Sequence, residues 1–288
     1  MSNYKYRTKT IRSGELVEVE IYPVYTGGRR LPTEKVNSTS EAVQKINRKN
    51  AEKKFIRLVN ANFGEGDLLI TCTHEGELPS EEQVDKDMRN FISRLKYRWK
   101  KAGRDPKELR YIYVTEYVTL AEAKTRGRRK IRLHHHLIIS AGLDRGEIEQ
   151  IWGHGGCNTR VLTPGIYGPA LLNIASYLMK DPRGSRRWGS SLNLRKPKIT
   201  ISDGKITRHR AGRMGTDEYE RDRTIEKLYP EHDIVDAYTT INGYNGGVYI
   251  YATLERRNRK NEVVRTKSTE LRDQLRSSRR NATSLPKI

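Results

Sequence analysis

The chain has 288 residues, and its 56 Lys and Arg against 35 Asp and Glu give a formal net charge of +21. A balance this basic is typical of proteins that bind a polyanion such as nucleic acid. The two cysteines exclude a disulfide-stapled scaffold, and no apolar run approaches the length of a membrane span. The first residues lack the apolar region of a signal peptide, so a cytoplasmic protein is expected.

The first hundred residues predict two strands and two helices, preceded by an N-terminal lead-in at 1–40 that contains the first strand. The strands are expected at 15–22 and 67–74, and the helices at 41–59 and 79–101. Ser38 or Thr39 is expected to cap the first helix. The basic side of that helix is either an ordinary solvated face or a surface that follows a phosphate backbone, and the sequence favours neither.

Residues 131–140 contain three consecutive histidines within a β-strand pattern. Side chains alternate along a strand, so His135 shares its face with leucine and isoleucine and is most simply a core histidine. His134 and His136 share the other face, about 7 Å apart, which is near enough for both imidazoles to bind one ion. Two interpretations stay open: a two-histidine metal site, or three ordinary histidines on a half-buried strand.

A second alternating strand is predicted at 111–119, and Glu116 falls on its apolar face. A carboxylate in that position is costly unless it is paired or bound to metal. The polar segment 120–130 suits a long hairpin loop, and antiparallel pairing with the histidine strand would bring the carboxylate to both outer histidines. Two imidazoles and one carboxylate suit a divalent ion. The simpler alternative is an ion pair between Glu116 and a nearby arginine.

Two later segments also carry candidate functional residues. His154 and Cys157 lie in a glycine-rich stretch, but without a second such pair we predict a turn rather than a metal site. Residues 169–180 predict a helix on which Tyr177 and Lys180, three positions apart, share a face. An ordinary surface pair is the simpler interpretation of that spacing alone.

Residues 183–213 form the most basic stretch, with ten Lys or Arg against one acidic residue. A tryptophan lies inside it, which suits a groove for single-stranded nucleic acid with phosphate contacts and base stacking. The candidate DNA-binding residues are Arg183, Arg186, Arg187, Trp188, Arg195, Lys196 and Lys198. Residues 236–254 have β-character. From 255 onward, eleven Lys or Arg against four Asp or Glu would add non-specific affinity for DNA.

These residues together resemble the HUH endonucleases, and more narrowly the rolling-circle replication initiators of bacterial plasmids and phages. Leu69-Ile-Thr-Cys-Thr73 matches the first motif of that family. His134-His135-His136 matches the second, with histidine at the usually hydrophobic middle position. Glu116 matches a third metal ligand on the preceding strand, and Tyr177-Leu-Met-Lys180 matches the helical Tyr-x-x-Lys motif. The resemblance covers roughly residues 60–200.

The sequence departs from that family pattern in two places. The middle histidine leaves open whether His135 or the outer pair binds metal, and strand facing favours the outer pair. Many phage members carry two tyrosines on the catalytic helix, whereas Asn173 and Asp181 stand one turn from Tyr177 here. Tyr167 is too far along the chain to share that helix face, so the chain resembles the single-tyrosine form.

The resemblance implies an α+β fold, with a five-stranded antiparallel sheet flanked by helices. It places an endonuclease domain at 41–215 and a C-terminal extension with a basic tail at 216–288. It further implies that His134, His136 and Glu116 bind Mg²⁺ or Mn²⁺.

The same resemblance implies a mechanism. Tyr177 attacks a phosphate of single-stranded or melted origin DNA, keeps the 5′ phosphate as a phosphotyrosine ester and frees a 3′-OH primer. Lys180 favours the phenolate or holds the adjacent phosphate, and the ester allows strands to be rejoined. The sequence contains no Walker A motif, so a separate helicase and polymerase of host or phage are expected, in the cytoplasm of a bacterial cell.

Two other functions fit parts of the sequence. A transposase or relaxase would use the same chemistry on a different DNA. A non-catalytic basic DNA-binding protein would need the positive charge alone, and the joint presence of two histidines, a glutamate, a tyrosine and a lysine in motif order argues against it.

Overall fold

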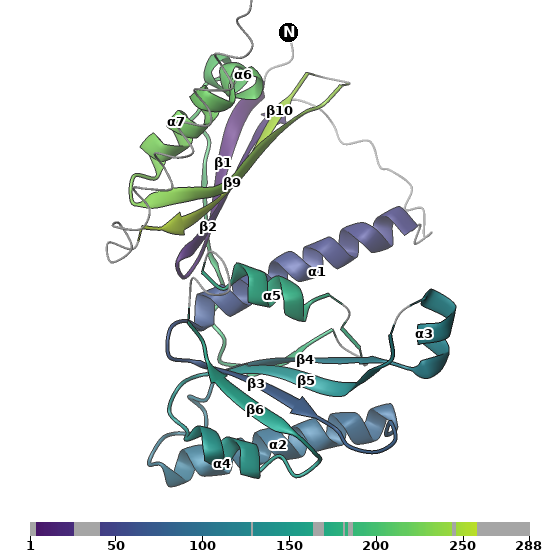
Figure 1. Ribbon diagram of the computed structural model, residues 1–288. Helices are drawn as coiled ribbons and strands as arrows, with labels where there is room; N and C mark the ends of the chain where they lie inside the picture. The colour runs from purple at the N-terminus through teal and green to yellow at the C-terminus, as the bar shows by residue number, and fades with distance from the viewer. Residues whose placement is uncertain are drawn as a thin grey trace, which may run out of the picture.

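The computed structural model has an α+β architecture built on two antiparallel five-stranded sheets (Figure 1). It describes residues 4–25, 41–127, 129–163, 170–180, 182–183, 187–243 and 246–257. The expected α+β fold with an antiparallel five-stranded sheet is confirmed, whereas the second sheet was not predicted. Within these described ranges, no helix combines the length and apolar composition of a membrane span. Several positions named above lie outside the described residues: Ser38, Thr39, Tyr167, Asp181, Arg186 and the tail from 258.

The first sheet has the strand order β6-β3-β5-β4-β7. Its strands are β6 (Cys157–Val161), β3 (Leu68–Thr73), β5 (Ile131–Ile139), β4 (Tyr111–Val118) and β7 (Gly189–Ser190). The two strands that carry the candidate metal ligands, β4 and β5, are antiparallel neighbours, as predicted. Their register sets Glu116 directly opposite His134.

Helices cover both faces of this sheet (Figure 1). On one face lie α2 (Glu81–Lys101) and α4 (Arg145–Gln150), and on the other α1 (Glu41–Asn62) and α5 (Leu172–Leu178). The strand alternation separates two cores. Leu137 and Ile139 pack in the core that contains α2 and α4, and Ile138 packs in the core that contains α1 and α5. The histidine strand is therefore buried on both sides, and neighbouring histidines face different cores.

The segment between β4 and β5 contains a helix, α3 (Leu120–Arg126), where a hairpin loop was expected. Thr119 accepts a hydrogen bond from the backbone of Glu122, and the Glu122 side chain accepts one from the Thr119 backbone, which forms a capping box. Gly127 ends the helix with φ 60°, a left-handed conformation that glycine adopts at little cost. The polar composition of the segment concealed these two local signals.

The second sheet has the order β8-β1-β2-β10-β9, and α6 (Arg208–Thr216) and α7 (Glu218–Leu228) pack on one face of it. Its strands are β8 (Lys198–Ser202), β1 (Tyr4–Ser13), β2 (Leu16–Tyr25), β10 (Val248–Arg256) and β9 (His232–Ile241). Residues 4–25 thus supply a strand pair within this sheet, rather than a mere lead-in. The boundaries expected near 40 and 215 stay predictions.

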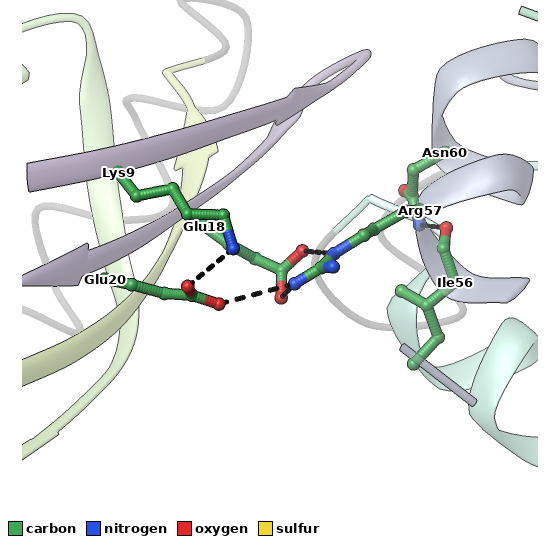
Figure 2. Close-up of polar contacts among 6 residues, drawn as sticks. All are labelled: Lys9, Glu18, Glu20, Ile56, Arg57 and Asn60. Carbon is green, nitrogen blue, oxygen red and sulfur yellow. Dashed lines mark hydrogen bonds and ion pairs between the residues drawn. The ribbon is translucent and has the colours of Figure 1, made fainter. Parts of the chain in front are cut away.

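The two sheets meet at α1, where Arg57 reaches the β1–β2 hairpin (Figure 2). The Arg57 guanidinium donates to both carboxylate oxygens of Glu18, at 2.5 and 3.0 Å, and lies 3.7 Å from Glu20. Lys9 pairs with Glu20 at 2.8 Å. The hairpin turn also presses on the helix: Gly14 has φ +60°, and a Cβ there would overlap the carbonyl oxygen of Asn60.

Candidate metal centre

Two paired strands bring three metal-ligating side chains together. Oε2 of Glu116 lies 3.3 Å from Nε2 of His134 and 3.9 Å from Nε2 of His136. One ligand atom from each of the three side chains lies within 4.8 Å of the other two. The geometry follows from the register of β4 and β5, because His136 is two residues beyond His134 and so faces the same side.

Hydrogen bonds leave the inner nitrogen of each imidazole as a lone-pair donor. Nδ1 of His134 donates to the Arg132 carbonyl at 2.8 Å, so the proton of the neutral ring sits on Nδ1 and Nε2 is bare. Nδ1 of His136 lies 3.2 Å from Oγ1 of Thr71, and its Nε2 is buried without a hydrogen-bond partner in the described part of the chain. Metal-binding histidines are oriented in this way through their other nitrogen, so these residues fit a divalent ion.

The charges of the cluster also suit a cation. The hydrogen bond from His134, opposed by burial, holds the pKa of Glu116 below its ordinary value. Burial, then the neighbouring His134, lowers the pKa of His136 to about 4, so this imidazole is neutral at pH 7. Burial by itself lowers the pKa of His134, but its bonds to Glu116 and to the Arg132 carbonyl raise the pKa overall. An anionic carboxylate and a neutral imidazole are the forms that bind metal.

The candidate nucleophile lies beside this cluster. The Tyr177 ring on α5 is 5.8 Å from the His136 ring, centroid to centroid, and 55% of the residue is exposed. The charge of Lys180 contributes to the lowered pKa of Glu116, which places this cation within electrostatic reach of the carboxylate. Tyr177 and Lys180 line a cavity of about 470 Å³ between α1 and α5. The structure therefore brings together all five residues proposed for metal binding and catalysis.

Residues 67–182 match a family model described as replication-associated protein ORF2. The matched range begins just before β3 and ends just after α5, so it includes both the metal-ligating cluster and Tyr177 with Lys180. No curated protein and no solved structure gives a significant match. The family match supports a role as a replication initiator.

The candidate DNA-binding residues are placed less uniformly. Arg183 pairs with Glu122 at 2.8 Å, and its guanidinium lies over the Tyr117 ring. Trp188 is half-buried and packs edge-on against Phe55, with ring centroids 5.7 Å apart. The residues with exposed side chains are Arg187, Arg195, Lys196 and Lys198. DNA contact by this set stays a prediction, in which the exposed cations are better placed than Arg183 or Trp188.

Sequence reasoning did not single out several residues of this region. Arg48 and Glu52 of α1 line the cavity beside Tyr177, and Arg48 donates to the backbone carbonyl of Lys180. Thr71 orients His136, although it belongs to a strand that the motif comparison had already selected. Only a contact between α1 and α5, far apart in the chain, could have revealed the first two.

Proposed function

We propose that the protein is a metal-dependent HUH endonuclease and strand transferase that starts rolling-circle replication by nicking single-stranded or melted origin DNA. One observation carries the proposal: an exposed tyrosine and a lysine on one helix lie beside a histidine–histidine–carboxylate cluster. A nucleophile next to a metal-binding set is the arrangement that phosphodiester transfer needs.

The residues divide the chemistry among them. Glu116, His134 and His136 would hold Mg²⁺ or Mn²⁺, whose positive charge polarises the scissile phosphate. Oη of Tyr177 attacks phosphorus and forms the phosphotyrosine bond, the bond from phosphorus to the 3′ oxygen breaks, and that oxygen is protonated to a 3′-OH. Lys180 offsets the negative charge near the reacting phosphate. Because the new ester is a phosphodiester, the reverse reaction rejoins strands with little change in bond energy.

A single tyrosine has consequences for the whole replication round. Asn173, one turn before Tyr177, lines the same cavity and offers no phenol. One subunit then holds only one DNA end at a time, so finishing a round needs a second subunit or a water molecule as the second nucleophile. The helicase and polymerase are separate proteins in this proposal, and the reaction takes place in the cytoplasm of a bacterial host.

The test replaces the nucleophile while keeping its ring. Tyr177→Phe should bind a single-stranded origin oligonucleotide as the wild type does but neither nick nor rejoin it. A matched control is Tyr219→Phe, because Tyr219 is 62% exposed and lies on α7, in the part of the molecule built on the second sheet. Mass spectrometry of the digested wild-type reaction should find the nucleotide adduct on the peptide that contains Tyr177. An adduct on another tyrosine, or cleavage by Tyr177→Phe, would overturn the proposal.

A further inference from the structure

A second cluster of metal-ligating side chains lies on the opposite side of the first sheet. His74 directly follows β3, Asp87 lies on α2, and His154 lies in the turn before β6. One ligand atom of each lies within 4.8 Å of the other two. The two imidazole rings are stacked, with centroids 5.5 Å apart and an interplanar angle of 26°.

The carboxylate of this cluster lacks a full counter-charge. Asp87 is 3% exposed, accepts a hydrogen bond from the Gln83 amide at 2.6 Å, and lies 3.7 Å from Nε2 of His154. Within the described residues, no lysine or arginine lies at ion-pair distance from it. A buried carboxylate whose nearest partners are a neutral amide and an imidazole is costly, and a bound cation would offset that cost.

The loop that carries His154 is held firmly against the end of β3. Nε1 of Trp152 donates to the Thr73 carbonyl at 3.1 Å, and the backbone N–H of Glu75 donates to the His154 carbonyl at 2.9 Å. Gly155 makes this approach possible: its φ is +136°, and a Cβ there would lie 2.6 Å from the Thr73 carbonyl oxygen. The positions of His74 and His154 are therefore fixed by the fold before any ligand arrives.

The ring of His74 is oriented by a buried neighbour. Nε2 of His74 lies 3.1 Å from Nε2 of His135, and Nδ1 of His135 lies 2.9 Å from Oγ1 of Thr115. An imidazole anchored through one nitrogen, so that its position is set before metal arrives, is the usual support of a metal-binding histidine. His135, which packs among core side chains, thus has a polar partner on each ring nitrogen.

We propose that His74, Asp87 and His154 form a second divalent-cation site, separate from the one beside Tyr177, and that it binds a Zn²⁺-class ion. Two imidazoles and one carboxylate suit such an ion, with water in the remaining position. The half-exposed side chain of His154 provides the route from solvent. Among the described residues, no tyrosine ring contacts this cluster, and the ion ties β3, α2 and the loop before β6 together. Its role is to stabilise the fold.

The test counts ions in the full chain. The wild type, stripped with EDTA and dialysed against Zn²⁺, should retain two ions per chain by elemental analysis. His154→Gln, at the exposed edge of the cluster, should retain one, and so should a His134→Gln/His136→Gln variant. His209→Gln, an exposed histidine outside both clusters, should retain two.

The same variants should separate in thermal stability. Saturating Zn²⁺ should raise the Tm of the wild type by at least about 5 °C, and this increase should be lost in His154→Gln and in Asp87→Asn. The stripped His154→Gln protein should melt close to the stripped wild type. If His154→Gln keeps every ion that the wild type binds, or keeps the full increase in Tm, the cluster is only a hydrogen-bonded part of the core and the proposal is wrong. A loss confined to the His134/His136 variant would have the same meaning.

Discussion

The two sides of strand β5 carry the same residue type in contrasting surroundings. His134 and His136 face Glu116 and an exposed tyrosine, beside a cavity of about 470 Å³. His135, between them in the chain, is fully buried and lies against His74 and Trp152. Each side offers imidazoles and one carboxylate, so the ligand set does not distinguish them. Access for a substrate and a neighbouring nucleophile assign chemistry to one side and fold stability to the other.

The largest effect should come from the side that faces Tyr177. His136→Ala, or His134→Ala, should reduce the rate of nicking on the order of a thousandfold, because the polarising charge of the ion contributes several kcal/mol to the transition state. Single-turnover cleavage of an origin oligonucleotide in Mn²⁺ measures this. If His134→Ala cleaves normally while a well-folded His135→Ala does not, the assignment of the two sides is reversed.

The middle histidine should act on stability instead. His135→Ala leaves a cavity and unpaired polar atoms on Thr115 and His74, and should lower the free energy of unfolding by about 2–4 kcal/mol. Denaturant unfolding of the EDTA-treated protein measures this. The fraction that stays folded should nick at close to the wild-type rate.

The same residue should make the fold sensitive to acid. Burial lowers the pKa of His135 to about 3, whereas the unfolded chain has the ordinary value near 6.5. Between these values the unfolded state binds a proton that the folded state does not, so stability is full above pH 6.5 and is lost as the pH falls towards 3. His135→Gln, compared with the wild type in EDTA, should show a shallower decline of Tm over this window. An unchanged slope would mean that another group causes the decline.

The smallest of these effects concerns the cation beside the nucleophile. Lys180→Ala should slow nicking on the order of 10- to 100-fold, or about 1.4–2.7 kcal/mol, with little change in affinity for a short oligonucleotide. Lys180→Arg, which retains the charge, should recover most of the rate. If raising the pH also restores the alanine variant, Lys180 acts by favouring the phenolate, and if it does not, Lys180 acts on the phosphate.

The histidine strand and its partner were predictable because alternation is strict there. Apolar residues at every second position decide which histidine enters the core, and Glu116 is the exception on an apolar face. The adjacency of Tyr177 to these ligands came only from the motif resemblance, since the spacing of Tyr177 and Lys180 alone fits any surface helix. In the structure the adjacency depends on α5 packing over the sheet, a long-range contact.

The second sheet and the second cluster were missed for different reasons. Strand β1 faces its core with Tyr6, Thr8 and Thr10 rather than with valine or isoleucine, and basic residues alternate with them, so its pattern resembles a polar segment. In the second cluster the ligands come from three separate elements. His154 was weighed only against its sequence neighbour Cys157, whose sulfur instead lies 3.6 Å from that of Cys72.

The close approach of Gly14 to α1 bears on how this gene can change over generations. Position 14 admits only glycine as long as Asn60 keeps its place, so neither position can drift alone. The ion pairs of Arg57 with Glu18 and Glu20 add a second matched set across the same boundary. A recombinant that takes residues 1–25 from one parent and α1 from a divergent one would inherit both mismatches. We expect such hybrids to be recovered as stable proteins only when the crossover carries the hairpin and the helix together.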